Sequence, residues 1–166
     1  YLAQDVAFDS PKAEGVRLAG TLTLPQGTGP FPVVVLITGS GPQDRDETLF
    51  GHKPFAVIAD ALTRRGIAVL RYDDRGVGRS TGEYSGSTAG DAATDVEAAI
   101  AYLKTRPEID QARIGLLGHS EGGIIAPLVA SRNTDVAFLV LLAAPGVRGD
   151  ELLLAQETLI EASMGA

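Results

Sequence analysis

The segment IGLLGHSEGGII, residues 114–125, places one serine between glycines, with apolar residues on both sides. Its first part, the short apolar run 114–117, favours a buried strand. Apolar residues then recur at helical spacing over 124–129, which favours a buried helix, and Pro127 inside this stretch is expected to bend the helix or weaken its start. Ser120 is therefore predicted to lie in a tight turn between a strand and a helix.

The rest of the chain repeats this change from strand to helix. Short apolar runs predict further buried strands at 33–37, 67–72 and 138–143. Apolar stripes at helical spacing predict helices over 55–62 and 92–103. Strands that alternate with helices through short connections indicate an α/β fold, with a mostly parallel sheet and helices on both of its faces.

The two ends of the chain carry different patterns. Residues 18–24 alternate apolar with small or polar side chains, which predicts antiparallel strands at the N-terminal edge of the sheet. The tail, 146–166, predicts an amphipathic helix after the last of the parallel strands.

The composition narrows the classes of function. The chain has 166 residues, 45% of them hydrophobic, which is enough for one domain with a substantial core. Its formal net charge of −7, without a cluster of Lys and Arg, argues against a nucleic acid or an anionic membrane as partner. The absence of cysteine excludes disulfides, thiolate catalysis and cysteine zinc sites. No apolar run is long enough to span a membrane.

The glycines around Ser120 match the needs of a sharp turn. Gly118 and Gly122 lie two residues before and two residues after the serine, where a side chain would collide with the other arm of the turn. Such a turn exposes the serine hydroxyl at the C-terminal edge of the sheet and directs the first N–H groups of the helix toward it. The pattern Gly-x-Ser-x-Gly in this setting is that of a nucleophile elbow.

The alternative for this segment is a purely structural glycine-rich turn between strand and helix, as in nucleotide-binding folds. Those folds have their own sequence motifs, either Gly-x-Gly-x-x-Gly or a Gly-Lys pair followed by Ser or Thr. Neither pattern follows any of the predicted strands. A nucleophile is therefore the favoured interpretation of Ser120.

Three segments together resemble the α/β-hydrolase superfamily, in particular its bacterial esterase and prolyl-aminopeptidase-like branches. The first is GHSEGG, 118–123, which is similar to the family's elbow. The second is TGSGP, 38–42, where the family has its oxyanion loop. The third is RYDDRGVGRS, 71–80, which resembles the family's Asp-x-Arg-Gly-x-Gly-x-Ser loop. The resemblance covers roughly 16–145 and implies an α/β-hydrolase fold.

This resemblance implies a serine hydrolase of the carboxylesterase type. Ser120 would attack the carbonyl carbon of a small carboxylic ester and form an acyl-enzyme. The backbone N–H groups of Ser40 and Glu121 would stabilise the oxyanion that develops on the substrate. Neither a cofactor nor a metal is expected.

The charged loop after the second parallel strand has a plainer interpretation. Asp73, Asp74 and Arg75 are expected to form ion pairs and turns that brace the elbow, because charged loop residues are usually solvated or paired. Tyr72 is expected to pack in the core. None of these four residues is a predicted catalytic group.

The chain lacks a histidine after Ser120. A serine hydrolase needs a histidine as general base and an acid that orients it, and in this family both follow the serine along the chain. The sequence contains only His52 and His119. His119 is the serine's neighbour and is expected to project in another direction, and His52 lies upstream in a long loop, so neither is the expected base.

The acids that follow the serine do not match the family's position either. Asp135 precedes a strand, at the wrong end of the sheet, and Asp150 and Glu151 begin the tail helix. We therefore expect the base and the acid to lie outside this chain. On this interpretation 1–145 is the N-terminal portion of a catalytic domain, and 146–166 is the start of a cap or lid.

Other functions are compatible with the same residues. A serine peptidase or a thioesterase would use the same chemistry, and a non-catalytic binding module of this fold would keep Ser120 without using it. The run 136–144 is too apolar for an exposed sheet edge. The remainder of the polypeptide or a second chain is therefore expected to complete the sheet, and a small-molecule ester is the expected substrate.

Overall fold

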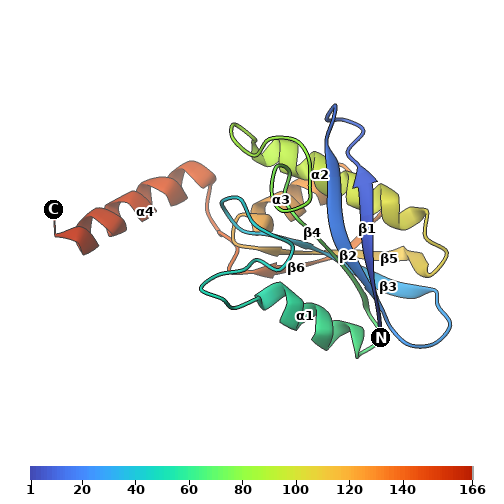
Figure 1. Cartoon of the computed structure of the whole chain (residues 1–166). Coiled ribbons are helices and arrows are strands. Elements are labelled where there is room, and N and C mark those ends of the chain that lie inside the picture. The colour runs from blue at the N-terminus through green and yellow to red at the C-terminus, as the bar shows by residue number, and fades with distance from the viewer. Residues whose placement is uncertain (166) are drawn as a thin grey trace.

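A six-stranded mixed sheet runs through the centre of the computed structural model, which describes residues 1–165 (Figure 1). The strand order is β1-β2-β4-β3-β5-β6. The last four of these strands are parallel to one another, and β1 and β2 are antiparallel to their neighbours. The strands are β1 Leu2–Asp9, β2 Arg17–Leu24, β3 Phe31–Ile37, β4 Ala68–Tyr72, β5 Ile109–His119 and β6 Val136–Leu142.

Helices cover both faces of the sheet, as the sequence predicts. Helix α1, Pro54–Thr63, lies on one face, and α2, Ala89–Lys104, lies with α3, Gly122–Ala130, on the other (Figure 1). The chain follows the predicted order of strand and helix from β3 to β6. Helix α3 continues through Pro127, so the proline leaves it intact and removes only one backbone donor.

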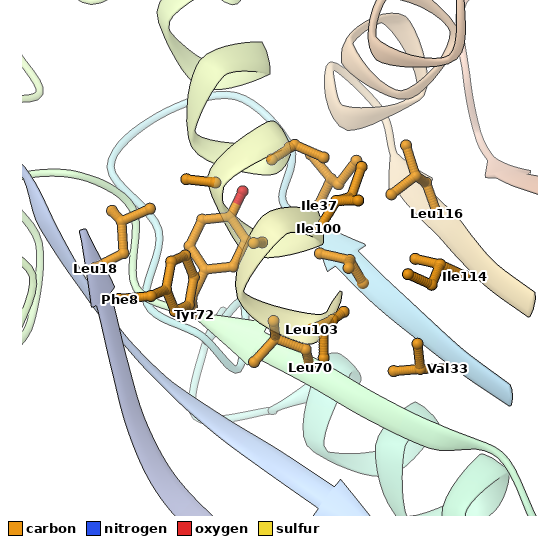
Figure 2. Packing of buried hydrophobic residues seen from close by; sticks show 14 of the residues in the cluster. Phe8, Leu18, Val33, Ile37, Leu70, Tyr72, Ile100, Leu103, Ile114 and Leu116 are labelled. Atoms are coloured by element: carbon orange, nitrogen blue, oxygen red, sulfur yellow. The ribbon is translucent and has the colours of Figure 1, made fainter. Parts of the chain in front are cut away.

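The core lies in two layers, one on each face of the sheet. Successive side chains of a strand point to opposite faces, and β3 shows this clearly. Val33, Val35 and Ile37 join the larger cluster beneath α2 and α3, which Figure 2 shows in part, whereas Val34 and Leu36 pack against α1. Because both faces are covered, every residue from 33 to 37 is buried, which explains the continuous apolar run in the sequence.

The N-terminal hairpin covers the end of the larger cluster. Strand β1 pairs with β2 along its whole length and brings Phe8 between two tyrosine rings. Phe8 stacks on Tyr102 at 5.2 Å and meets Tyr72 edge-on at 5.9 Å between ring centroids. Burial raises the pKa of Tyr72, as does the negative charge of Asp95. The predicted packing role of Tyr72 is confirmed.

Helix α2 begins with a reciprocal cap. The N–H of Asp91 donates to the hydroxyl of Thr88, and the N–H of Thr88 donates to the carboxylate of Asp91. Two N–H groups that have no partner inside the helix are thereby satisfied. The cap fixes where α2 starts, at the edge of the sheet where β3, β4 and β5 end.

Strand β6 and helix α4, Gly149–Met164, leave apolar side chains exposed. Residues 138–142 of β6 are 36–45% exposed, and no residue of α4 is buried. The tail therefore forms the predicted helix, but α4 projects away from the sheet without a packing partner among residues 1–165 (Figure 1). Within that same range, no helix has the length and hydropathy to cross a membrane.

The buried face of α2 gives a test of this packing. Leu103 is fully buried in the larger cluster, so Leu103→Ala in the whole protein is expected to lower the free energy of unfolding by about 2–5 kcal/mol. Val57 on α1 is 57% exposed, and Val57→Ala is expected to change it by no more than about 0.5 kcal/mol. Denaturant titration measures both. Equal losses in the two variants would contradict the placement of α2.

Candidate active site

Ser120 lies in a left-handed backbone conformation between β5 and α3. Its φ is 51°, a value that residues other than glycine rarely adopt. Two backbone hydrogen bonds hold the turn: the N–H of Ser120 donates to the carbonyl of Leu142 at 2.9 Å, and the N–H of Gly123 donates to the carbonyl of Ser120 at 2.9 Å. The strand-to-helix turn that the sequence predicts at Ser120 is therefore present.

The glycine positions of this turn have no space for a side chain. A Cβ at Gly118 would overlap the carbonyl of Gly122, and a Cβ at Gly122 would overlap the carbonyl oxygen of Ile37 at the end of β3. A Cβ at Gly123 would overlap the side chain of Ala144. The sequence predicts the need for the first two glycines, and the structure adds the third.

The loop after β3 approaches the elbow from the side. A Cβ built on Gly39 would lie 3.3 Å from Cβ of Ser120, so the backbone at Gly39 faces the serine directly. The N–H of Gly39 is occupied, since it donates to Oε1 of Glu47 at 2.7 Å. In the described part of the chain, the N–H groups of Ser40 and Glu121 have no hydrogen-bond acceptor. Two free amides therefore lie in the two loops that meet at Ser120.

His119 pairs with a carboxylate rather than with its neighbour Ser120. Its Nδ1 lies 2.8 Å from Oε1 of Glu47, the same oxygen that accepts from Gly39. This agrees with the expectation that the side chain of His119 projects away from the serine. The other histidine, His52, is exposed in the loop before α1, where its backbone forms a bridge with Leu49.

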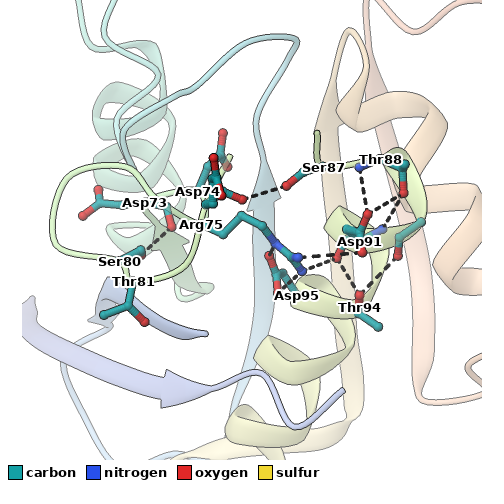
Figure 3. A network of polar contacts seen from close by, with 12 residues as sticks. Asp73, Asp74, Arg75, Ser80, Thr81, Ser87, Thr88, Asp91, Thr94 and Asp95 are labelled. Carbon is teal, nitrogen blue, oxygen red and sulfur yellow. Dashed lines mark hydrogen bonds and ion pairs between the residues drawn. The ribbon is translucent and has the colours of Figure 1, made fainter. Parts of the chain in front are cut away.

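The charged loop after β4 forms the expected ion pairs and turns, which Figure 3 shows in part, but within residues 1–165 no hydrogen bond or ion pair joins Asp73, Asp74 or Arg75 to the elbow residues 118–123. Arg75 donates to both carboxylate oxygens of Asp95 on α2, at 2.8 and 2.9 Å. Asp73 accepts from the guanidinium of Arg45 and from the N–H of Arg79. Burial alone would raise the pKa of Asp73, but these hydrogen bonds outweigh it and leave the pKa lowered. The prediction is corrected: the network ties β4 to α2 and to the loop after β3.

Asp74 holds the loop after β3 at two points other than the one that Glu47 binds. Its carboxyl accepts from the hydroxyl of Thr38 at 2.9 Å and from the N–H of Gln43 at 3.0 Å. Burial raises the pKa of Asp74 to about 7, and the negative charge of Asp95 adds to the rise, although both hydrogen bonds oppose it. Asp74 is thus protonated over much of the acidic range.

A cavity of about 60 Å³ lies between the loop after β3 and the start of α3. Gly39, Asp74, Tyr84, Glu121 and Ile125 are among the residues that line it. The cavity therefore has apolar walls with a few polar groups, which is the usual character of a small-molecule site. Among residues 1–165, no group of three or more His, Asp or Glu side chains is placed to hold a metal ion.

The acids downstream of the serine lie away from this arrangement in the fold. Asp135 pairs with Lys104 at the end of α2, at 2.7 Å, next to the start of β6. Asp150 pairs with Arg148 at the exposed start of α4, and Glu151 follows it there. As the sequence indicates, none of these three is placed as a partner of Ser120.

Comparison with known proteins identifies the family. Residues 53–164, about two thirds of the chain, match the family described as serine aminopeptidase, S33. The chain belongs to the serine aminopeptidase S33 family. The match begins just before α1 and includes the charged loop, the elbow at Ser120 and α4.

Relatives of this S33 chain include esterases and thioesterases. Esterase EstD of Thermotoga maritima is 36% identical over 148 residues, which are 89% of this chain and 35% of that protein. The mitochondrial acyl-coenzyme A thioesterase 2 of Mus musculus is 30% identical over 93% of this chain and 31% of that protein. The chain thus spans about a third of the length of these two relatives.

Solved structures share the fold of this S33 chain. The match to the α/β hydrolase GrgF from Penicillium covers 100% of this chain and 56% of the GrgF chain, with a TM-score of 0.75 and 25% identity. The match to the esterase Pf2001 of Pyrococcus furiosus covers 87% of this chain and 53% of the esterase chain, with a TM-score of 0.71 and 25% identity. The chain therefore has the α/β-hydrolase fold, as the three sequence segments imply.

The sequence pattern does not single out Glu47, and it predicts a different role for Asp74 from the one found. Glu47 lies in the irregular loop between β3 and α1, and no periodic pattern marks its side chain as buried. Asp74 was expected to brace the elbow, and it instead binds the loop that carries Ser40. The only signal for Glu47 is its place shortly after the TGSGP segment, which gives no direction to the side chain.

The close approach at Gly122 gives a second test. Gly122→Ala adds a methyl group that overlaps the carbonyl of Ile37, so the free energy of unfolding should fall by about 1–3 kcal/mol. Gly146→Ala is the matched control, since nothing lies within 4 Å of the added methyl, and no loss is expected. Thermal unfolding of both variants checks this. A Gly122→Ala protein as stable as wild type would show that the elbow is less tight than described.

The carboxyl of Asp74 gives a test that depends on pH. Its raised pKa means that the folded protein binds more protons than the unfolded chain between about pH 4 and pH 7, so its contribution to stability is lost as pH rises through this window. Asp74→Asn keeps a neutral acceptor and is expected to raise the free energy of unfolding at pH 8 by about 1–3 kcal/mol. At pH 5 the stabilisation by Asp74→Asn should be smaller than at pH 8, because the folded Asp74 carboxyl is then largely protonated.

The control for this variant is Asp9→Asn, which removes the same charge from an exposed strand end. Denaturant titrations at pH 5 and pH 8 on the whole protein measure the difference for each variant. A stabilisation by Asp74→Asn that is equal at the two pH values would contradict an Asp74 carboxyl that titrates near neutral pH.

Proposed function

We propose that the whole protein is a serine hydrolase that cleaves small carboxylic esters, with Ser120 as its nucleophile. The backbone N–H groups of Ser40 and Glu121 act as the oxyanion donors, and Gly118 and Gly122 allow the turn that places them. The observation that supports this assignment best is the meeting of a strained serine with two free amides from different loops. A backbone strain of this kind persists where the surroundings enforce it, often at a functional site.

The reaction that fits these groups is acyl transfer in two steps. The hydroxyl oxygen of Ser120 bonds to the ester carbon, its proton passes to a general base, and the carbonyl electron pair moves to the oxygen facing Ser40 and Glu121. The tetrahedral adduct collapses, the bond to the alcohol oxygen breaks, and the base returns its proton to the departing alcohol. Water then cleaves the acyl-enzyme by the same sequence and releases the carboxylic acid.

The general base and the acid that orients it are proposed to come from outside these 166 residues. The two histidines of the chain are held elsewhere, His119 by Glu47 and His52 in an exposed loop. The exposed apolar side chains of β6 are consistent with further strands at this edge, from the rest of the polypeptide or from a second chain. In this proposal 1–145 is part of the catalytic domain and 146–166 begins a cap or lid.

An ester is favoured over a coenzyme A thioester as the substrate. The esterase relative is more similar to this chain than the thioesterase relative, at 36% against 30% identity. Coenzyme A carries several phosphate charges, and the net charge of −7 on this chain disfavours such an anionic leaving group. The thioesterase relatives make a thioester the second candidate.

The nucleophile is tested by an activity-based probe on the whole protein. A fluorophosphonate is expected to label the wild type once, because an activated serine attacks phosphorus as it attacks a carbonyl, and Ser120→Ala should lose all labelling. Ser131→Ala, at the exposed end of α3, is the matched control and should label like the wild type. Mass spectrometry locates the label. A folded wild type that takes no label would leave only a binding module.

A substrate comparison separates the ester, thioester and peptide candidates. The wild type is supplied with p-nitrophenyl acetate, with acetyl-coenzyme A and with an aminoacyl p-nitroanilide, and kcat/KM is measured for each. The proposal expects the ester to give the highest value and Ser120→Ala to abolish it. A higher kcat/KM for the thioester would replace the ester assignment with the second candidate.

A further inference from the structure

Glu47 is a buried carboxylate that the proposed reaction does not use directly. It lies in the loop between β3 and α1 and is 7% exposed. Its backbone is in the left-handed region, with φ at 51°, and its N–H donates to the carbonyl of Asp44 at 2.9 Å. The carboxylate of Asp44 accepts from the N–H groups of Asp46 and Thr48, the residues directly before and after Glu47. These hydrogen bonds hold the turn in place. The turn directs the side chain of Glu47 inward, toward the elbow.

One oxygen of Glu47 joins the two loops that meet at Ser120. Oε1 accepts from the N–H of Gly39 at 2.7 Å and lies 2.8 Å from Nδ1 of His119. Since a carboxylate oxygen only accepts, Nδ1 of His119 is the donor of the second bond. The two partners stand directly before Ser40 and directly before Ser120 in the chain. Glu47 therefore links the end of β3 to the end of β5 at the level of the reacting groups.

This link determines how the two amides are placed relative to each other. Ser40 is joined to Gly39 by one peptide bond, and Glu121 is separated from His119 only by Ser120. The two glycines of the segment 38–42 allow many backbone conformations, and the bond from Gly39 to Glu47 restricts them. The N–H of Gly39, being occupied, is also withdrawn from the group of donors that a substrate oxygen could reach.

We propose that Glu47 is a positioning residue of the oxyanion hole, which acts by tying Gly39 to His119. The inference rests on the proposed function, because it assigns Ser40 and Glu121 as donors. Loss of the tie is expected to leave substrate binding almost unchanged and to lower the rate of the chemical step, because the donors bind the oxyanion and not the neutral carbonyl.

The test compares variants at Glu47 in the whole protein with p-nitrophenyl acetate. Glu47→Ala removes the acceptor and is expected to lower kcat by about 100-fold with KM changed by less than about threefold. Glu47→Gln retains an oxygen for both donors and is expected to recover kcat to within about fivefold of wild type. Glu14→Ala, at an exposed carboxylate between β1 and β2, is the matched control and should match the wild type.

Two further measurements separate positioning from a merely structural role. A trifluoromethyl ketone, which forms a tetrahedral adduct with an active serine, should lose affinity in Glu47→Ala in proportion to the loss of kcat/KM. Amide exchange at Gly39 should become faster in the same variant, since its N–H loses its acceptor. If Glu47→Ala does not fold, Glu47→Asp serves instead, because its shorter side chain cannot reach both partners.

The outcomes distinguish this inference from the proposed function. If Ser120→Ala abolishes turnover and Glu47→Ala keeps the kcat of the wild type, the role of Glu47 is wrong and the hydrolase assignment stands. Equal losses of kcat in Glu47→Gln and Glu47→Ala would also overturn it, since the retained oxygen would then have no effect. If Ser120→Ala turns over ester like the wild type, both proposals fail together.

Discussion

The backbones of β5 and α3 approach so closely around Ser120 that neither can carry a side chain at the point of contact. Gly118 and Gly122 fill these positions, and Gly122 also touches the carbonyl of Ile37 at the end of β3. Strands β3 and β5 and helix α3 can therefore contact one another through their backbones, because glycines stand at the points of contact. Ser120 adopts its left-handed conformation at this contact, between the two glycines.

The loop that faces the elbow is held by two carboxyl groups, although the proposed reaction develops negative charge beside it. Glu47 binds the N–H of Gly39, and Asp74 binds Thr38 and Gln43. A second negative charge at this place would oppose the oxyanion. The raised pKa of Asp74 shows one way in which the fold limits this conflict, because burial keeps that carboxyl neutral at acidic pH and partly neutral near pH 7.

Much of the architecture follows from local patterns in the sequence. The continuous apolar run 33–37 and the helical stripe 92–103 each belong to one element, so their periodicity is enough to predict it. The turn at Ser120 is equally local. The bond from Glu47 to His119 joins residues 72 positions apart and depends on a left-handed turn at a glutamate, which no periodic pattern announces. The partners of Asp74 are likewise set by how two loops pack, which only the folded chain specifies.

The backbone of Ser120, the proposed nucleophile, is held by a strand that follows it in the chain. The N–H of Ser120 donates to the carbonyl of Leu142, the last residue of β6, so the serine's own backbone is held by the outermost strand described here. Because β6 follows Ser120 in the chain, this hydrogen bond can form only after β6 has been synthesised and has paired with β5. The backbone of the proposed nucleophile is therefore among the last parts of this sheet that can be completed during synthesis.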